Sequence, residues 1–182
     1  GLDLEAQMED FFSNLARKRP VLAVANTIST EKLMGYPGQT GRYDPHVWMD
    51  PLLWIFVVEQ IASAMAKIRP EKKDEFQRNA DDYKSKLVNL NDYAKTVLKT
   101  VPNKSRVLIT AHDAFGYFGK AYGFEVLGVQ GISTNSEAGL YRIKEIVDIL
   151  VERKISSVFV ESSVSDQNMR ALIEGANARG HK

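Results

Sequence analysis

The segment 71–101 constrains the fold of this chain more than any other part of the sequence. Its apolar residues recur at alternating steps of four and three, and it contains neither proline nor glycine. This pattern predicts one continuous amphipathic helix between Pro70 and Pro102. At 1.5 Å per residue such a helix would be about 45 Å long, which exceeds the diameter of a small lobe. Its apolar positions are Phe76, Ala80, Tyr83, Leu87, Leu90, Ala94, Val97 and Val101.

A helix of this length is either a coiled-coil arm or a strut that spans two lobes. The apolar stripe extends little beyond four heptads and includes two alanines and a tyrosine, which favours the strut. We therefore expect a lobe over residues 1–70, a linking backbone helix over 71–101 and a second lobe over 102–182.

The second lobe is predicted to contain a parallel sheet. Short β-branched runs alternate there with helical patterns, an order typical of a parallel sheet with helices on both faces. Thr134 and Glu137 have the spacing of a capping box at the start of one of these helices. The expected strands are 106–112, 124–129 and 157–161, and the expected helices are 114–122, 138–153 and 166–178.

The first lobe is expected to hold one buried strand between helices, and strands alternating with helices make the fold class of the chain α/β. The last helix of this lobe begins with Asp50 as the N-cap and Pro51 as the first helical residue. Trp48 and Trp54 are expected to anchor that helix in the core. The expected elements are a helix over 3–18, a buried strand over 21–28, a loop over 29–45 and a helix over 51–68.

Composition removes several classes of function. The net charge is +1, from 24 Lys and Arg against 23 Asp and Glu, so the sequence gives no reason to expect a nucleic-acid partner. The absence of cysteine excludes disulfides, Cys-zinc sites and thiol nucleophiles. There is no G-x-S-x-G elbow, Walker loop or G-x-G-x-x-G fingerprint.

Two of the three histidines lie where an α/β sheet binds ligands, beyond the carboxyl ends of strands. His112 ends the strand 106–112, and His46 follows the loop after the strand 21–28. Imidazole suits zinc, manganese, iron or copper and rarely acts alone, so carboxylates would be needed to complete a metal site. The nearby candidates are Asp44, Asp50, Asp113 and Glu161.

Simpler roles exist for each of these residues. A histidine in a loop is usually a surface or hydrogen-bonded residue, so spacing alone leaves the roles of His46 and His112 open. Asp50 and Asp113 are placed to cap helices, and Glu161 could serve the helix that follows it. His181, beside Gly180, is expected to be an exposed turn residue.

Three stretches carry a resemblance to a known family. "DPHVWMDP", "TAHDAFGYFGKAYGFEVLGVQGISTNSEA" and "VFVESSVSDQNMRALIEGANARGHK" resemble the metal-binding receptors of zinc and manganese ABC importers, the cluster A-I or TroA-like solute receptors. The resemblance covers essentially the whole chain. It implies two parallel-sheet lobes, one long backbone helix and a four-ligand metal site between the lobes.

The resemblance assigns His46 and His112 as metal ligands that face one another across the cleft between the lobes. Asp113 and Glu161 match family positions outside the usual ligand set, so they are expected to support the ligands. The family's first ligand, a histidine, lies upstream of "GLDLE", and its last, an aspartate, lies downstream of "ARGH". We therefore expect both lobes to be incomplete in this chain, which should bind metal weakly and associate with itself.

The implied function is a non-enzymatic receptor at the periplasm or cell surface. It would capture Mn²⁺ or Zn²⁺ as transported ligand and deliver the ion to the permease of an ABC importer. Residues 29–45 contain no histidine, which favours manganese or a general divalent cation over a dedicated zinc receptor. The alternatives are a metal-dependent hydrolase using His46 and His112, and an adhesive or structural module with a vestigial metal site.

Overall fold

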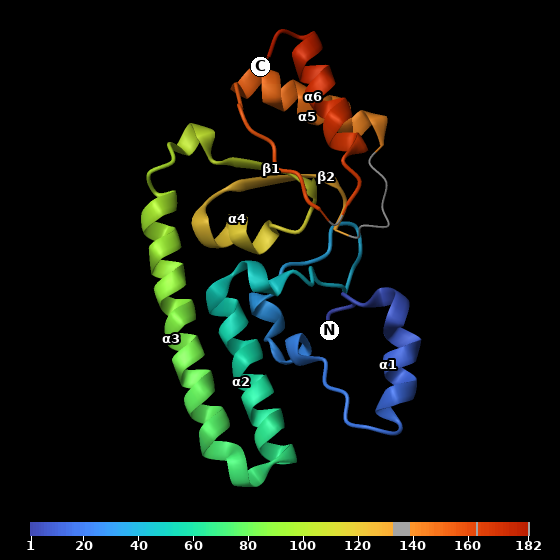
Figure 1. Cartoon of the computed structure of the whole chain (residues 1–182). Helices are drawn as coiled ribbons and strands as arrows, with labels where there is room; N and C mark the ends of the chain where they lie inside the picture. Colours follow the sequence, from blue (N-terminus) through green and yellow to red (C-terminus); the bar gives the residue numbers. More distant parts are fainter. Residues whose placement is uncertain (133–138, 163, 182) are drawn as a thin grey trace. The chain divides into compact units, whose positions relative to one another are not determined.

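The computed structural model describes residues 1–132, 139–162 and 164–181, and it confirms the long helix predicted from the sequence (Figure 1). This helix, α3, runs over Lys73–Leu98 and follows a 3-10 turn over Pro70–Lys72. It ends three residues before the predicted end at residue 101, in a turn that precedes Pro102.

The chain forms two compact units, Gly1–Lys95 and Thr96–Lys182, and α3 crosses the boundary between them. Each unit is described by itself below. The division into lobes at residues 70 and 101 stays a proposal.

In the first unit, α2 spans Pro51–Ile68 and begins as predicted. The carboxylate of Asp50 accepts hydrogen bonds from the backbone nitrogens of Leu52 at 2.9 Å and Leu53 at 3.3 Å, and Pro51 occupies the first helical position. The N-cap role expected for Asp50 is therefore confirmed. These bonds satisfy backbone donors that the first turn of a helix leaves without partners.

α2 runs alongside α3 (Figure 1), and small and branched side chains of the two helices form a buried cluster. Trp54 packs against this cluster, as expected, whereas the expectation for Trp48 is wrong because its side chain is 38% exposed. The buried residues of the cluster are Val58, Ala62, Ala80 and Leu87.

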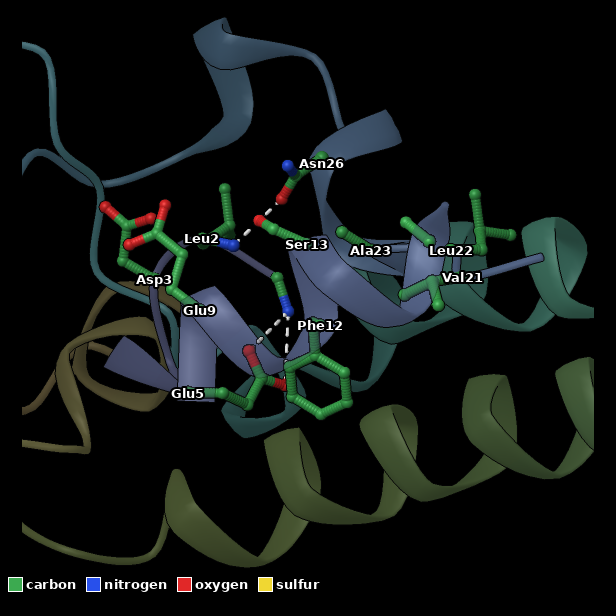
Figure 2. A pocket seen from close by; sticks show the side chains of 12 residues that line it. Leu2, Asp3, Glu5, Glu9, Phe12, Ser13, Val21, Leu22, Ala23 and Asn26 are labelled. Atoms are coloured by element: carbon green, nitrogen blue, oxygen red, sulfur yellow. Dashed lines mark hydrogen bonds and ion pairs between the residues drawn. The ribbon is translucent and has the colours of Figure 1, made fainter. Parts of the chain in front are cut away.

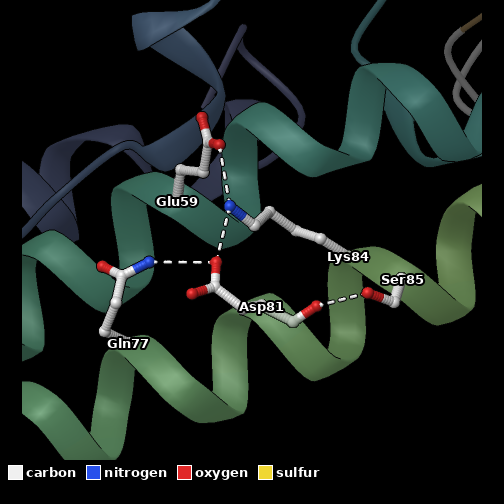
Figure 3. A network of polar contacts seen from close by, with 5 residues as sticks. All are labelled: Glu59, Gln77, Asp81, Lys84 and Ser85. Atoms are coloured by element: carbon white, nitrogen blue, oxygen red, sulfur yellow. Dashed lines mark hydrogen bonds and ion pairs between the residues drawn. The ribbon is translucent and has the colours of Figure 1, made fainter.

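A polar network also joins the two helices (Figure 3). The ammonium group of Lys84 on α3 contacts Glu59 on α2 at 3.2 Å and Asp81 at 2.8 Å. Gln77 donates to Asp81 at 3.1 Å. Hydrogen bonds from Lys84 and then Gln77 lower the pKa of Asp81, and the two carboxylates raise the pKa of Lys84.

The outer face of α2 is apolar. By length and composition α2 could cross a membrane, with a mean hydropathy of 1.4, and the core helix of a globular protein passes the same test. Its large exposed side chains are Leu52, Phe56, Ile61, Met65 and Ile68.

The strand predicted over 21–28 is wrong. The chain forms a 3-10 turn over Val24–Thr27 instead, and Ile28 N–H donates to the carbonyl of Ala25 at 3.2 Å. A strand needs a neighbouring strand to satisfy its backbone groups. Within residues 1–95, all of which have a described backbone, no strand forms beside it, so the apolar run satisfies its backbone groups locally.

The other elements of the first unit are short. The helix predicted over 3–18 is a 3-10 turn over Ala6–Met8 followed by α1 over Glu9–Ala16. Residues 29–45 form the expected loop, with a 3-10 turn over Thr30–Lys32 and an antiparallel bridge between Gly35 and Tyr43.

The second unit contains the predicted parallel strands. β1 spans Val107–His112 and pairs with β2, Glu125–Gln130, with His112 opposite Gln130. The third predicted strand, 157–161, is reduced to one bridge between Thr110 and Phe159. The α/β class is therefore confirmed, and its parallel sheet lies in the second unit.

Helices cover both faces of the strand pair, as expected. Figure 1 shows α4, Gly116–Tyr122, on one side and α5, Leu140–Arg153, with α6, Gln167–Ala178, on the other. The capping box predicted at 134–137 lies outside the described residues. Alternate residues of β1 and β2 meet α5 and α6 in one core, formed by Val107, Ile109, Ala111, Val129, Ile146, Val147, Leu150, Ile155, Met169, Leu172 and Ala176.

Candidate metal centre

His46 lies in the turn that leads from the loop into α2, directly before a 3-10 turn over Val47–Met49. It is buried, and so is Asp44, two residues earlier. One oxygen of Asp44 contacts both the backbone nitrogen of His46 at 2.9 Å and the ring Nδ1 at 2.7 Å. The ring of Trp48 meets the imidazole edge-to-face, with centroids 5.3 Å apart. The side chain of His46 is thus fixed by its immediate neighbours in the sequence.

His112 is the last residue of β1 and is buried as well. Its Nδ1 lies 2.9 Å from Oε1 and 2.7 Å from Oε2 of Glu161, and its backbone nitrogen donates to Oε1 at 3.2 Å. Glu161 is 49 residues away in sequence, just after the bridge at Phe159. The sheet edge therefore brings this carboxylate to the histidine.

The two histidines share one hydrogen-bonding pattern. In each case a carboxylate accepts from the backbone N–H and from the ring Nδ1–H of the same residue. An ionised carboxylate can only accept, so the proton belongs on Nδ1 and the lone pair of the neutral ring on Nε2. Imidazoles that bind metals commonly have this arrangement, with the second nitrogen on a carboxylate.

The remaining carboxylate candidates have other roles. Asp50 caps α2, as described above. The cap expected from Asp113 is wrong, because α4 begins at Gly116 with Phe115 as its N-cap. The backbone nitrogen of Asp113 donates to the carbonyl of Gln130 at 3.1 Å, which extends the β1–β2 pairing past His112.

The strand end beside His112 contains another polar group. Gln130, opposite His112 in register, has a buried side-chain oxygen without a hydrogen-bond partner among the described residues. Buried acceptors are usually satisfied by protein, water or a bound ligand. An open hollow of about 770 Å³ adjoins Glu161 at the same end of the sheet.

Among the described residues, no group of three or more His, Asp and Glu side chains is gathered as a metal site would need. His46 belongs to the first unit and His112 to the second. That the two histidines bind one ion stays a prediction.

The expectation for His181 is wrong. Its side chain is partly buried, and Nε2 lies 2.6 Å from the carbonyl oxygen of Ile155, a distance at which the ring donates to that carbonyl. This histidine holds the end of α6 against the segment after α5.

A hollow of about 420 Å³ lies in the first unit beside α1 (Figure 2), and no residue of the two histidine–carboxylate pairs lines it. Two of the carboxylates that line it have cationic partners, since Glu5 contacts the nitrogen of Gly1 at 3.0 Å and Asp3 contacts Arg42 at 3.0 Å. We assign it no metal-binding role.

Sequence reasoning treated Asp44 and Glu161 as candidate ligands or support, and the structure gives each a specific histidine. The signal for Asp44 is in the sequence, because an aspartate commonly accepts from the backbone nitrogen two residues later. The pairing of Glu161 with His112 requires the sheet.

Comparison with known proteins identifies the family. The model of the family described as the periplasmic component A of the zinc-uptake complex, ZnuA, matches residues 1–181. The manganese-binding lipoprotein MntA of Bacillus subtilis (strain 168) is 45% identical over 181 residues, covering 100% of this chain and 59% of the relative. The zinc-binding protein TroA of Treponema pallidum (strain Nichols) is 40% identical over 181 residues, with 58% of the relative covered.

Solved structures agree with this assignment. The periplasmic zinc-binding protein TroA from Treponema pallidum superposes with a TM-score of 0.95 over 100% of this chain and 65% of that chain. A mutant structure of the laminin-binding adhesin Lmb from Streptococcus agalactiae gives a TM-score of 0.84 at 28% identity, over 97% and 66% of the two chains. The chain thus spans less than two thirds of its relatives in length, and it has the fold of TroA. It belongs to the ZnuA family of periplasmic metal-uptake components, as the resemblance implied.

Proposed function

We propose that this protein is a divalent-metal receptor that captures Mn²⁺ or Zn²⁺ outside the cytoplasm and delivers the ion to the membrane permease of an ABC importer. One observation carries the proposal. In a chain of the ZnuA family, two buried histidines each have Nδ1 on a carboxylate, which prepares Nε2 for a metal. The proposal includes the extracytoplasmic location, since relatives are named as lipoproteins or periplasmic proteins.

In this proposal His46 and His112 are ligands of one ion, and the chain comprises a lobe over 1–70, a linking helix over 71–101 and a lobe over 102–182. The other two ligands expected from the family, a histidine and an aspartate, correspond to no residue in the motifs of this chain. The relatives support both metals, since MntA is named for manganese and TroA for zinc. Nitrogen and oxygen ligands suit both ions.

The receptor would have no enzymatic activity. The relatives are named as binding proteins, which supports this part of the proposal. Hydrolysis of simple esters by the metal-loaded chain, abolished in His46→Ala, would favour the hydrolase alternative instead.

Calorimetric titration of the 182-residue chain with Mn²⁺ and with Zn²⁺ tests metal capture. We expect weak binding that falls at least about tenfold, or 1.4 kcal/mol, in His46→Ala and in His112→Ala. His181→Gln is the matched control, because that ring contacts the carbonyl of Ile155 and is not a proposed ligand. Equal affinities in all four proteins, or no binding by any, would refute the proposal.

An adhesive role is the second candidate, favoured by the likeness to the laminin-binding adhesin Lmb. Binding of the chain to immobilised laminin separates the two functions. The receptor proposal expects no saturable binding, whereas saturation that persists in a His46→Ala, His112→Ala double variant would favour adhesion.

We also propose that the isolated chain associates with itself through exposed apolar side chains on α1 and α2, such as Phe11, Phe56 and Ile68. Light scattering at increasing concentration should give a rising mass. A constant monomer mass would contradict this.

A further inference from the structure

We propose that Glu161 is a positioning residue that makes the metal-binding form of His112 depend on the docking of residues 157–161 against β1. This inference rests on the proposed function, because it assigns how one of the two ligands of that site is prepared. Asp44 provides the internal comparison, since it holds His46 in the same way without any distant segment.

The first step is the double contact of Glu161. Both of its oxygens lie within 2.9 Å of the His112 ring nitrogen Nδ1, and Oε1 also accepts from the His112 backbone N–H. The carboxylate therefore fixes the ring about χ1 and χ2 and requires Nδ1 to donate. The neutral ring then presents its lone pair at Nε2, the atom through which we propose that it binds metal.

The second step is how Glu161 reaches this position. The segment that carries it is held to β1 by the hydrogen bond from Phe159 N–H to the Ile109 carbonyl at 2.8 Å and by the bridge to Thr110. The side chains of Phe159 and Val160 are exposed, so they add little burial at this point. The carboxylate is in place only while this attachment is made.

The third step is the contrast with His46. Asp44 is two residues from the ring that it holds, and its own backbone nitrogen donates to the carbonyl of Met34 at 2.9 Å. This pair remains assembled as long as the turn at 44–46 is formed. Loss of the docked segment at 157–161 should therefore affect His112 and leave His46 unchanged.

The test reads the ring tautomers of the metal-free chain by long-range ¹H–¹⁵N NMR. We expect His112 in the wild type to carry its proton on Nδ1. The Nδ1–H population should fall in Glu161→Gln, where one amide oxygen serves two donors, and fall further in Glu161→Ala. The His46 signals should remain as in the wild type. An unchanged His112 tautomer in both variants would overturn the proposal.

A backbone variant tests the dependence on docking. Phe159→Pro removes the N–H that donates to Ile109, whereas Phe159→Ala keeps it. We expect the proline variant to shift the His112 tautomer as Glu161→Ala does, and the alanine variant to resemble the wild type. Equal effects of the two substitutions would contradict the proposed link.

Metal titration supplies the second readout. Mn²⁺ and Zn²⁺ affinities should follow the tautomer series, with a loss of about 10- to 100-fold in Glu161→Ala. Glu125→Gln, an exposed glutamate in the same unit paired with Arg153, should leave both readouts unchanged. If the wild type binds no metal, the proposed function fails while the tautomer series still decides the role of Glu161.

Discussion

The two units of this protein are stabilised in different ways. In the second unit, one core joins two parallel strands to α5 and α6. In the first unit, α2 and α3 share a smaller cluster, supplemented by the Asp50 cap and by the polar network around Lys84, and Ile28, Leu33 and Val47 are buried outside that cluster. The difference follows from backbone chemistry, because a helix satisfies its own hydrogen bonds whereas a strand depends on a neighbour.

The largest expected effect comes from truncating the core of the second unit. Leu172 has no exposed surface and lies in the core cluster that contains residues of α5, α6 and both strands, so Leu172→Ala should lower the free energy of unfolding by about 3–5 kcal/mol. Leu87→Ala, at the contact of α2 and α3, should cost about 2 kcal/mol because the cluster around it contains fewer buried side chains. Urea unfolding followed by circular dichroism measures both losses.

Ile173→Ala is the control for this comparison, because it removes a similar side chain that is 43% exposed and adjacent to Leu172. Its cost should be below about 1 kcal/mol. Equal losses for Leu172→Ala and Leu87→Ala would show that the two units do not differ in packing.

A smaller effect is expected at Gly128 on β2, where the backbone of Asp113 lies very close. A Cβ at Gly128 would lie 2.6 Å from the backbone of Asp113, so Gly128→Ala must displace the residue that follows His112. We expect a loss of about 1–3 kcal/mol and shifted NMR signals of the His112 ring. Gly139→Ala is the control, since its Cβ would meet no described atom within 4 Å. Unchanged stability and unchanged ring signals in Gly128→Ala would refute the tight approach.

The smallest effect concerns the polar network of the first unit. The pKa of Asp81 is lower in the folded protein than in the unfolded chain, so its ionised carboxylate stabilises the fold at pH values above the unfolded-state pKa. This contribution is lost as the pH falls below about 4 and through the folded-state pKa. The stability difference between the wild type and Asp81→Asn should therefore shrink on acidification and with added salt. Asp82→Asn, an exposed neighbour on α3, is the control. A difference that is constant from pH 6 to pH 3 would contradict this role.

The elements that could be predicted from sequence are those whose signals are local. The long helix α3 and the start of α2 at Asp50 follow from periodicity and cap chemistry within a few residues. The apolar run at 21–28 has the composition of a buried strand, but its residues do not reveal whether a partner strand is present. Asp113 has the residue type and position of a helix cap, but its backbone continues the pairing with Gln130 and the helix begins later, after Phe115.

The candidate site shows the same limit. His112 was identified from a strand end that the structure contains, whereas the strand that pointed to His46 does not form, so the signal for His46 was the family motif. Asp44 is close enough in sequence for its contact to be anticipated. The contact of Glu161 with His112 depends on which segment lies along the free edge of β1. That order is set by tertiary packing, which a single sequence does not display.

The turn at 44–48 has a consequence for protein engineering. Asp44, His46 and Trp48 form a histidine with its own carboxylate and a ring against its edge, all within one short loop. Transferring this unit would need an entry and an exit for the chain and a site that buries Asp44 and His46 as this fold does. Placed at the mouth of an unrelated scaffold, it would supply an imidazole already oriented for coordination, whereas His112 could be moved only together with the edge of a sheet.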